Sequence, residues 1–231
     1  MEIKSTKNIA ENTTIRSISI GDSGKGKTRF SGSISKYGKP FVIDVEKGLT
    51  TCADLDIDYV EVDNWNQLTE AYSWFLKNYQ EKGYTHLVID SLTRLQEYWI
   101  RDNAPNGKMT QPQWGECLAW MKKFVDKVTK ECPVHVHMTA MAMESKDELT
   151  GGIKVYPNIQ GQFKHNLPGY FDVVLYHDCG VKDGNTIYWV QTEGDQRIIA
   201  RNRLNAVAPM AKKEVSDYGI IARIYNGGNE Q

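Results

Sequence analysis

The chain has 231 residues, of which 40% are hydrophobic and 25% are charged, and its formal net charge is −1. This composition is typical of a globular protein and excludes a disordered chain or a membrane-spanning one, since no apolar run approaches the length of a membrane-spanning helix. A charge this close to zero restricts any nucleic-acid binding to a local basic patch.

The first predicted elements are a strand and a helix on either side of a glycine-rich stretch. Thr13–Ile20 is rich in β-branched residues and predicts a strand, with Ile18 and Ile20 on one face. Residues 28–37 predict a helix that ends before Gly38. The glycine-rich stretch between them, residues 21–28, is therefore placed as a strand-to-helix turn.

This stretch, Gly-Asp-Ser-Gly-Lys-Gly-Lys-Thr, fits the phosphate-binding pattern G-x-x-x-x-G-K-[ST] without a mismatch. Glycine at 21 and 26 lets the backbone close around an anion, and the helix dipole adds positive charge there. Lys27 supplies a charge for the β- and γ-phosphates, and the Thr28 hydroxyl is a hard ligand for Mg²⁺. The alternative, a glycine-rich turn that binds nothing, is disfavoured by the flanking strand and helix. We predict an ATP and Mg²⁺ site whose nucleotide-binding residues are Gly21, Asp22, Ser23, Gly24, Lys25, Gly26, Lys27, Thr28 and Arg29.

The elements that follow alternate between strands and helices. Strands are predicted at 41–44, 58–62, 86–90, 134–140, 171–176, 186–191 and 219–225, and helices at 65–82, from 92 to about 101, and at 114–131. Residues 104–113 and 141–158 are predicted loops, and residues 182–185 a turn. This order predicts an α/β fold with a central, mostly parallel sheet flanked by helices, and with extra C-terminal strands. It further predicts a single domain over 1–231, in which 1–12 is a flexible lead and 196–231 a basic segment and strand.

Two acidic residues follow predicted strands, where a parallel sheet gathers its ligands. Asp90 ends an apolar run and is predicted to hold Mg²⁺ and to accept a hydrogen bond from Thr28. Its alternative role is to cap the next helix. Glu46 is the best candidate for the general base, with a solvated surface glutamate as the alternative. Asp44 is interpreted as structural.

Together the phosphate loop, the pattern D-x-E-x-G at 44–48 and the apolar run ending in Asp90-Ser91 resemble the RecA-like recombinase ATPases. The chain is most similar to the compact phage-encoded members, which consist of little more than the ATPase core. The resemblance implies a RecA-like P-loop fold and identifies Glu46 as the residue that activates water. The family's Asn-Gln sensor at the end of the fourth strand is absent. Thr139 is the nearest polar residue, with Glu144 as the alternative, which favours annealing or ATP-gated DNA binding over full strand exchange.

A basic segment near the end of the core extends the resemblance. Arg201-Asn202-Arg203 is similar to the family's basic–Asn–basic strand, whose cations reach a neighbouring subunit's γ-phosphate. By that similarity Arg201 and Arg203 are expected to act in trans. Two features of the sequence support this expectation without the resemblance. Arg201 and Arg203 occupy alternate positions, which share a face in a strand, and residues 196–213 contain no acidic residue to neutralise them. A solvated basic edge or a phosphate-backbone patch is the alternative.

The same family holds single-stranded DNA with two loops, which by position are residues 104–113 and 141–163. The candidates in these loops combine cations with groups that could stack on bases, although Glu144 weakens the electrostatic case. A plain mobile loop is the alternative for each. The candidate DNA contacts are Lys108, Met109, Lys146, Lys154 and Tyr156.

Cysteine and histidine residues carry weaker signals. The four cysteines contain no C-x-x-C pair, which favours free thiols in a reducing cytoplasm, and residues 1–4 lack a signal-peptide core. His135 and His137 share a strand face, which suggests zinc, but no cysteine pair lies nearby. Half-buried strand filling is the preferred interpretation for both histidines.

These features predict an ATPase that oligomerises around single-stranded DNA, stimulated by DNA, and that hydrolyses ATP between subunits during recombination or annealing. Its expected partners are single-stranded DNA and further copies of itself, with a single-strand-binding protein as a further candidate and no membrane partner. Its expected location is the cytoplasm of a phage's host. Two alternatives are a motor or loader ATPase for a phage helicase or packaging machine, and a nucleotide-dependent scaffold that does not hydrolyse ATP.

Overall fold

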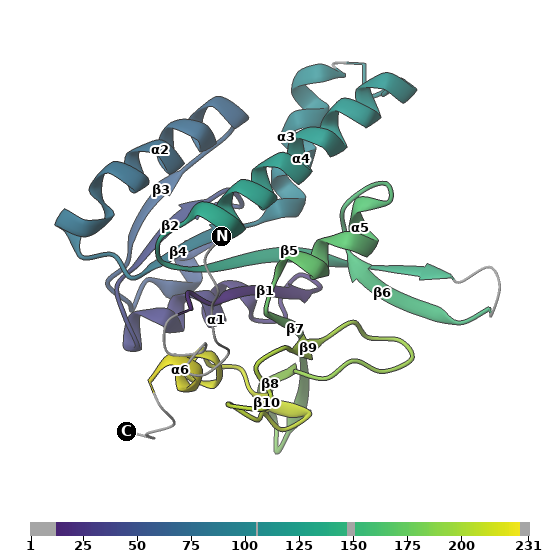
Figure 1. Ribbon diagram of the computed structural model, residues 1–231. Coiled ribbons are helices and arrows are strands. Elements are labelled where there is room, and N and C mark those ends of the chain that lie inside the picture. The colour runs from purple at the N-terminus through teal and green to yellow at the C-terminus, as the bar shows by residue number, and fades with distance from the viewer. Residues whose placement is uncertain (1–12, 105, 147–150, 227–231) are drawn as a thin grey trace, which may run out of the picture.

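The computed structural model describes residues 13–104, 106–146 and 151–226. The expected flexible lead, residues 1–12, lies outside the described residues. A ten-stranded mixed sheet runs through the molecule in the order β10-β8-β7-β1-β5-β4-β2-β3, with β6 paired to β5 and β9 paired to β7 (Figure 1). The strands are β1 (Arg16–Gly21), β2 (Pro40–Asp44), β3 (Asp58–Glu61), β4 (His86–Asp90), β5 (His135–Lys146), β6 (Ile153–Pro157), β7 (Val173–Lys182), β8 (Asn185–Gln191), β9 (Arg201–Asn202) and β10 (Lys213–Val215).

The middle of the sheet is parallel and one edge is antiparallel. Every neighbouring pair from β7 through β1, β5, β4 and β2 to β3 is parallel. β8 and β10 then add in antiparallel order beyond β7. The predicted mostly parallel sheet with extra C-terminal strands is confirmed, and the carboxyl ends of β1, β4 and β2 meet at one edge.

Helices cover both faces of the sheet. On one face lie α2 (Trp65–Lys82), α3 (Leu92–Asn103) and α4 (Gln111–Glu131), and on the other lie α1 (Lys27–Gly32) and α6 (Gly219–Tyr225) (Figure 1). The short α5 (Phe163–Asn166) packs beside β6. Each face of the sheet has its own buried apolar cluster. Ile18 and Ile20 of β1 belong to the cluster beneath α2, α3 and α4, and Phe30 and Tyr218 belong to the cluster on the side of α1 and α6. This is the arrangement of a P-loop ATPase fold.

Local sequence signals account for the helix boundaries. The Asn64 side chain caps α2 by accepting a hydrogen bond from the Gln67 amide at 3.0 Å, and Gly83 ends that helix in the left-handed region. Thr110 and Gln113 form a capping box that starts α4 at Gln111, three residues before the predicted start. The helix predicted at 28–37 is α1 followed by a 3₁₀ turn over Ser33–Lys36.

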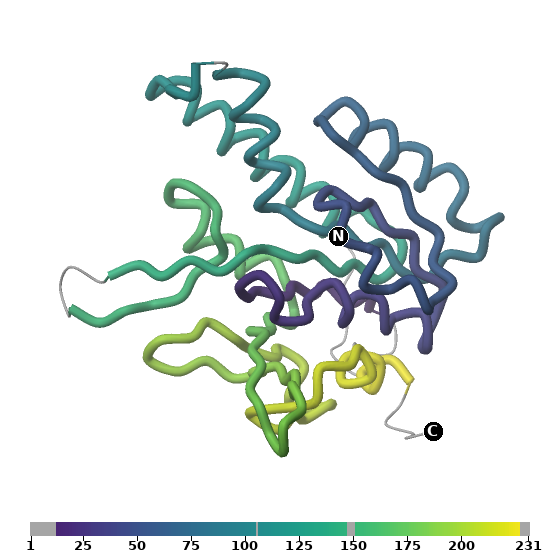
Figure 2. The backbone as a smooth tube through the Cα atoms, turned by 180° about the vertical axis from the view of Figure 1, so that it is seen from behind, coloured from purple at the N-terminus to yellow at the C-terminus, as the bar shows by residue number. Residues whose placement is uncertain are grey.

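Two predicted elements were wrong. Within the predicted loop 141–158, residues 141–146 are instead the end of β5 and Ile153–Pro157 form the strand β6, and the two pair in antiparallel order, while residues 147–150 lie outside the described residues. The predicted strand 219–225 is α6. Its apolar residues Ile220, Ile221 and Ile224 follow helical spacing, but a seven-residue apolar run does not separate helix from strand by pattern alone. Figure 2 shows α6 lying against the segment of β1 and α1, and there the Tyr218 amide donates to Ser33 Oγ at 2.8 Å.

Histidines fill the sheet face beneath α1 and α6. His137 Nδ1 lies 2.8 Å from Ser17 Oγ, and Ser19 Oγ lies 2.7 Å from His177 Nε2. His135 Nδ1 accepts from the Ile15 amide, and its ring stacks on Tyr225 with centroids 4.1 Å apart. Burial lowers the pKa of His137 to about 3 and that of His135 to about 4. The preferred interpretation, strand filling, agrees with these contacts. Within residues 13–104, 106–146 and 151–226, no cluster of three or more metal-ligating side chains occurs and no helix is long and apolar enough to cross a membrane.

Candidate active site

The glycine-rich loop lies between the end of β1 and the start of α1, as predicted. Gly26 caps α1 with a φ of 85°, a left-handed conformation that favours glycine. Gly21 lies so close to β7 that a Cβ there would be 2.9 Å from the His177 carbonyl oxygen. Both glycines are therefore required by the path of the backbone, Gly26 by its conformation and Gly21 by its packing on β7, while closure around an anion stays a prediction.

Lys27 is buried and its ammonium group is held inside the loop. Its Nζ donates to the carbonyl oxygens of Gly21 at 2.8 Å and Asp22 at 2.9 Å, and approaches Met141 Sδ at 3.5 Å. Burial lowers its pKa, while the charges of Glu46, Asp90 and Asp22 act in the opposite sense. The atoms in contact with the Lys27 ammonium group, two carbonyl oxygens and a thioether sulfur, are therefore all uncharged. An anionic ligand in the loop would be a stronger partner.

Asp90 is buried beneath the loop with a donor on each oxygen. Thr28 Oγ1 donates to Oδ2 at 2.7 Å, and the hydroxyl of Thr139 donates to Oδ1. Burial raises the pKa of Asp90 to about 6, although the two hydroxyls lower it. Thr28 and Asp90 together supply hard oxygen donors of the kind that Mg²⁺ prefers. The predicted contact between Thr28 and Asp90 is present, and Thr139 on the intervening strand β5 joins it.

Glu46 lies in the turn after β2 and faces the same place. Its Oε1 accepts a hydrogen bond from the Ser91 hydroxyl, next to Asp90. The turn is held by Asp44, whose Oδ1 accepts from the Lys47 amide at 2.7 Å and the Gly48 amide at 3.4 Å. Asp44 therefore has the structural position that the sequence indicated, and it leaves Glu46 at the mouth of the loop.

A cavity of about 460 Å³ opens at the phosphate loop. Loop residues, Glu46, Met141, Tyr188 of β8 and Ser216 are among its lining residues, whereas Asp90 lies buried behind Thr28. Its volume suits a nucleotide-sized ligand, and Lys27 and Glu46 place charged groups on its wall. In this arrangement Lys27 can bind phosphate oxygens, Thr28 and Asp90 can hold a divalent cation, and Glu46 can accept a proton from water.

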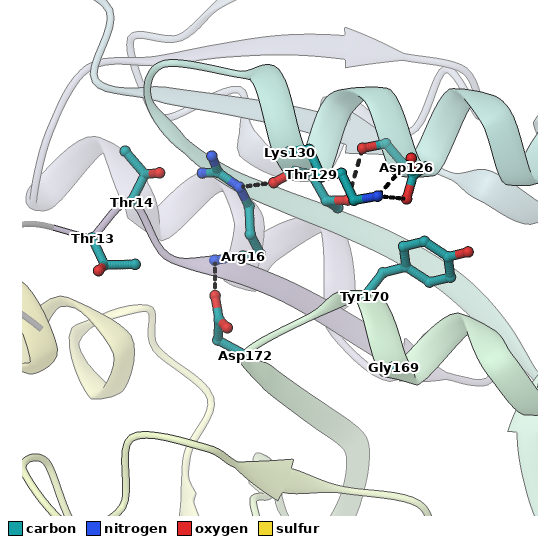
Figure 3. Close-up of a pocket in the computed structure, with 9 residues that line it drawn as sticks. All are labelled: Thr13, Thr14, Arg16, Asp126, Thr129, Lys130, Gly169, Tyr170 and Asp172. Carbon is teal, nitrogen blue, oxygen red and sulfur yellow. Dashed lines mark hydrogen bonds and ion pairs between the residues drawn. The ribbon is translucent and has the colours of Figure 1, made fainter. Parts of the chain in front are cut away.

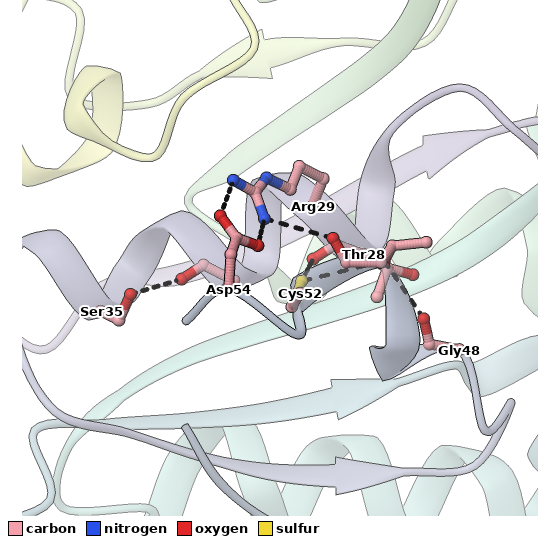
Figure 4. A network of polar contacts seen from close by, with 8 residues as sticks. Thr28, Arg29, Ser35, Gly48, Cys52 and Asp54 are labelled. Carbon is pink, nitrogen blue, oxygen red and sulfur yellow. Dashed lines mark hydrogen bonds and ion pairs between the residues drawn. The ribbon is translucent and has the colours of Figure 1, made fainter. Parts of the chain in front are cut away.

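Arg29 extends the polar lining outward from α1. Its guanidinium group pairs with both oxygens of Asp54, with Nη2 to Oδ2 at 2.7 Å (Figure 4). Arg29 Nη1 also donates to the Thr51 carbonyl at 3.2 Å, and Cys52 Sγ lies 3.6 Å from the Thr28 carbonyl. These contacts fix the 3₁₀ turn Leu49–Cys52 against α1, so Arg29 lines the cavity with its charge already paired.

Several residues at the site were missed by the sequence analysis. Lys25 Nζ pairs with Asp178 of β7 at 2.8 Å, Ser91 holds Glu46, and Tyr188 reaches the loop from β8. Asp178 and Tyr188 are at least 150 positions from the loop in the sequence, and no local motif marks them. Only Ser91 had a signal, since it directly follows Asp90.

Arg201 and Arg203 lie at the opposite edge of the sheet from the phosphate loop. Arg201 pairs with Val174 near the start of β7, and its Nη2 donates to the carbonyl oxygens of Pro168 at 2.5 Å and Phe171 at 3.0 Å. Arg203 is more exposed, with Nη2 donating to the Gly169 carbonyl at 2.8 Å. The structure does not bring either arginine to the loop of its own chain. Their action on a neighbouring subunit stays a prediction.

A second cavity of about 670 Å³ includes in its lining Gly169 and Asp172, both of which Arg203 contacts (Figure 3). The buried Arg16 forms part of its wall, and its guanidinium group donates to the carbonyl oxygens of Thr129, Cys132 and Val134, each at 2.7 Å. The Arg16 amide donates to Asp172 Oδ2 at 3.0 Å. These contacts tie the end of α4 to the start of β1, which gives this edge a structural role.

The candidate DNA contacts are spread over two projecting parts of the molecule. Lys108 is exposed between α3 and α4, but Met109 is half-buried and packs against the apolar core. Lys146 and Lys154 are exposed on the hairpin of β5 and β6, which projects from the sheet (Figure 1). Tyr156 on the same hairpin is half-buried, because its ring meets His165 with centroids 4.6 Å apart and Lys164 Nζ at 5.7 Å.

Comparison with known protein families identifies the family of the chain. A family model described as an AAA domain covers residues 13–204, from the first strand to the residue after Arg203. The matched span includes the phosphate loop, Glu46, Asp90 and Thr139. No curated protein matches the chain.

Proposed function

The chain belongs to the AAA domain family of P-loop ATPases, and from this premise we propose that it is a single-stranded-DNA-binding recombination or annealing ATPase. In this proposal the protein oligomerises around DNA, and it hydrolyses ATP at the interfaces between subunits. The proposed relationship is to the compact, phage-encoded RecA-like recombinases. Both DNA and further copies of the chain are proposed partners.

One observation carries the ATPase part of the proposal, namely that Lys27, Thr28 and Glu46 line one cavity at the edge of the sheet, with Asp90 buried directly behind Thr28. Lys27 would neutralise charge on the transferring phosphoryl group. Thr28 and Asp90 fit a Mg²⁺ ion, which supplies further charge stabilisation when bound. Glu46, oriented by Ser91, would take the proton of the attacking water. Thr139 would position Asp90.

The DNA part of the proposal is supported by the exposed cations Lys108, Lys146 and Lys154 on the projecting segments. A lysine neutralises the charge of the nucleic-acid phosphates without contacting base edges. Binding would therefore not depend on base identity and would weaken as the salt concentration rises. Arg197 on the neighbouring segment is paired with Glu144, which reduces its availability.

The assembly part is supported by Arg203, whose side chain is 46% exposed and forms a loose ion pair with Asp172 at 3.7 Å and a single hydrogen bond to the Gly169 carbonyl. Such a group can leave its partner at low cost and reach an anion on a second copy. Arg201 is held more firmly by two carbonyl groups. Of the two proposed fingers, Arg203 is therefore the better placed to act in trans.

Fluorescence anisotropy on a labelled single-stranded oligonucleotide tests the proposal. Titrations are made with and without a non-hydrolysable ATP analogue and Mg²⁺, over a range of salt concentrations, with Lys27→Ala as the variant that cannot hold the triphosphate. We expect tight binding that requires the analogue, weakens steeply with salt and is lost in Lys27→Ala. Nucleotide binding without any DNA binding would overturn the recombinase proposal and favour a motor or loader. Unchanged ATP affinity in Lys27→Ala would overturn the site itself.

A further inference from the structure

Two residues that line the cavity at the phosphate loop, Tyr188 and Ser216, have no role in the proposed binding of phosphate or Mg²⁺. Lys27, Glu46 and Met141 mark the part where the loop would hold the β- and γ-phosphates. The cavity continues past Gly26 to Tyr188 and Ser216. Because the α-phosphate of a bound nucleotide would lie toward the first turn of α1, the nucleoside must occupy this continuation.

Tyr188 is well placed on that wall. Its ring lies against the loop, since a Cβ at Gly26 would be 3.0 Å from Tyr188 Cδ1. Its backbone is held in the middle of the sheet's antiparallel part, with Cys179 of β7 opposite, so the ring is carried by a strand and not by a free loop. The Ser216 amide approaches the Tyr188 carbonyl at 3.4 Å, which places both lining residues together.

The Tyr188 ring packs on Gly26, but the side chain has no polar or aromatic partner among the described residues. No hydrogen bond, ring contact or cation engages it there, and the residue is 42% exposed. The next aromatic on the strand, Trp189, differs in this respect. Lys213 Nζ lies 5.1 Å from the Trp189 ring centroid, and a Cβ at Gly180 would be 3.0 Å from that ring. Arg29, the other large side chain beside the cavity, already has its charge paired with Asp54.

We propose that Tyr188 is the base-stacking residue of the nucleotide site, with its ring against the nucleobase of a bound nucleoside triphosphate. This inference rests on the proposed nucleotide-binding function and adds the group that holds the nucleoside. Stacking uses the π-face that every base has, so Tyr188 contributes affinity without choosing between adenine and guanine.

Isothermal titration calorimetry with three ligands separates base contacts from phosphate contacts. ATP, GTP and inorganic tripolyphosphate, each with Mg²⁺, are titrated into the wild-type protein and into Tyr188→Ala, Tyr188→Leu and Tyr188→Phe. We expect Tyr188→Ala and Tyr188→Leu to weaken ATP and GTP by roughly tenfold each, the size of a lost stacking contact. Tripolyphosphate should bind all variants equally, and Tyr188→Phe should bind ATP as the wild type does.

Two controls make the outcome specific. Tyr59→Ala removes a tyrosine that is 54% exposed on the far edge strand β3 and should change none of the three affinities. Lys27→Ala should lose ATP and tripolyphosphate together. Wild-type ATP affinity in Tyr188→Ala and Tyr188→Leu, or an equal loss of tripolyphosphate affinity in both, would overturn the stacking role while leaving the phosphate site intact. Failure of the wild type to bind any of the three ligands would overturn both proposals.

Discussion

The Thr28 hydroxyl donates a hydrogen bond to Asp90 Oδ2 over 2.7 Å, which joins the first turn of α1 to the end of β4. Thr139 supplies the second donor from β5, the strand that separates β1 from β4. A buried carboxylate with a hydroxyl on each oxygen is oriented before any ligand arrives. Asp90, the proposed cation ligand, is thus held by the sheet through Thr139 and by the phosphate loop through Thr28.

Replacing Thr139 by valine should show how much this orientation contributes. The change keeps the shape of the side chain but removes one donor from the buried Asp90, so we expect a loss of about 1–3 kcal/mol in the free energy of unfolding. Urea denaturation of the wild type, Thr139→Val and Thr139→Ser measures it. Serine retains the hydroxyl and should lose less than valine. Equal losses in both variants would attribute the effect to packing.

Glu46→Gln should separate binding from hydrolysis. Glutamine keeps the contact with Ser91 possible but cannot take a proton, so we expect ATP affinity near wild type and turnover at least about 100-fold slower. Calorimetry and a phosphate-release assay measure the two quantities. Glu61→Gln, at the end of the neighbouring strand β3 and paired only with Lys47, is the matched control. Normal turnover in Glu46→Gln would move the general base to another residue.

Two kinds of information allowed part of this site to be predicted from the sequence. One is a local sequence motif, and the other is the rule that ligands of a parallel sheet bind at the carboxyl ends of its strands. Residues 21–28 carry their own motif, and Asp90 and Glu46 follow strands whose carboxyl ends meet at one edge. Tyr188 and Asp178 could not be predicted, because they reach the loop through the pairing of β7 with β1, and no motif fixes that pairing. The sequence pattern also missed α6, whose seven residues are too few for periodicity to decide.

Arg16 should be a strong determinant of stability. Its buried guanidinium group satisfies three carbonyl oxygens at the end of α4, so Arg16→Met would leave them without a charged donor. We expect a loss of about 2–3 kcal/mol in the free energy of unfolding. Urea denaturation measures the loss, with Lys130→Met as the control beside the same cavity. Lys130 forms an exposed pair with Asp126 and should change stability by less than about 1 kcal/mol. Similar losses in both variants would contradict the role of Arg16.

The buried histidines should make the fold acid-sensitive. Burial lowers the pKa of His86 and His137 to about 3 and of His135 to about 4, from an ordinary value of 6.5. Below pH 6.5 the unfolded chain therefore binds protons that the folded chain excludes. Stability is complete above that pH and falls toward pH 4, by up to about 1.4 kcal/mol per histidine per pH unit. Burial raises the pKa of Asp90 to about 6 and also raises that of Asp44, so these two carboxyl groups act in the opposite sense. Burial lowers the pKa of His177 as well, so four histidines oppose two carboxyl groups.

Urea denaturation at pH 7.5 and at pH 5.5 measures this dependence. We expect lower stability at pH 5.5 in the wild type and a smaller difference in His135→Gln, which removes one of the titrating groups but keeps an amide near the Ile15 backbone. An identical difference in the two proteins would assign the pH dependence to groups other than His135.

Mixing two inactive variants tests whether Arg203 acts between subunits. A Glu46→Gln subunit keeps its arginine, and an Arg203→Ala subunit keeps its general base, so each variant alone has no complete interface. If the contact is made in trans, an equal mixture that assembles at random should contain complete sites at about a quarter of its interfaces, because a head-to-tail contact takes one group from each subunit. Phosphate release by the mixture should then exceed that of either variant alone. Activity no higher than the separate variants would place Arg203 outside the neighbour's site, and its contact with the Gly169 carbonyl would then be its whole role.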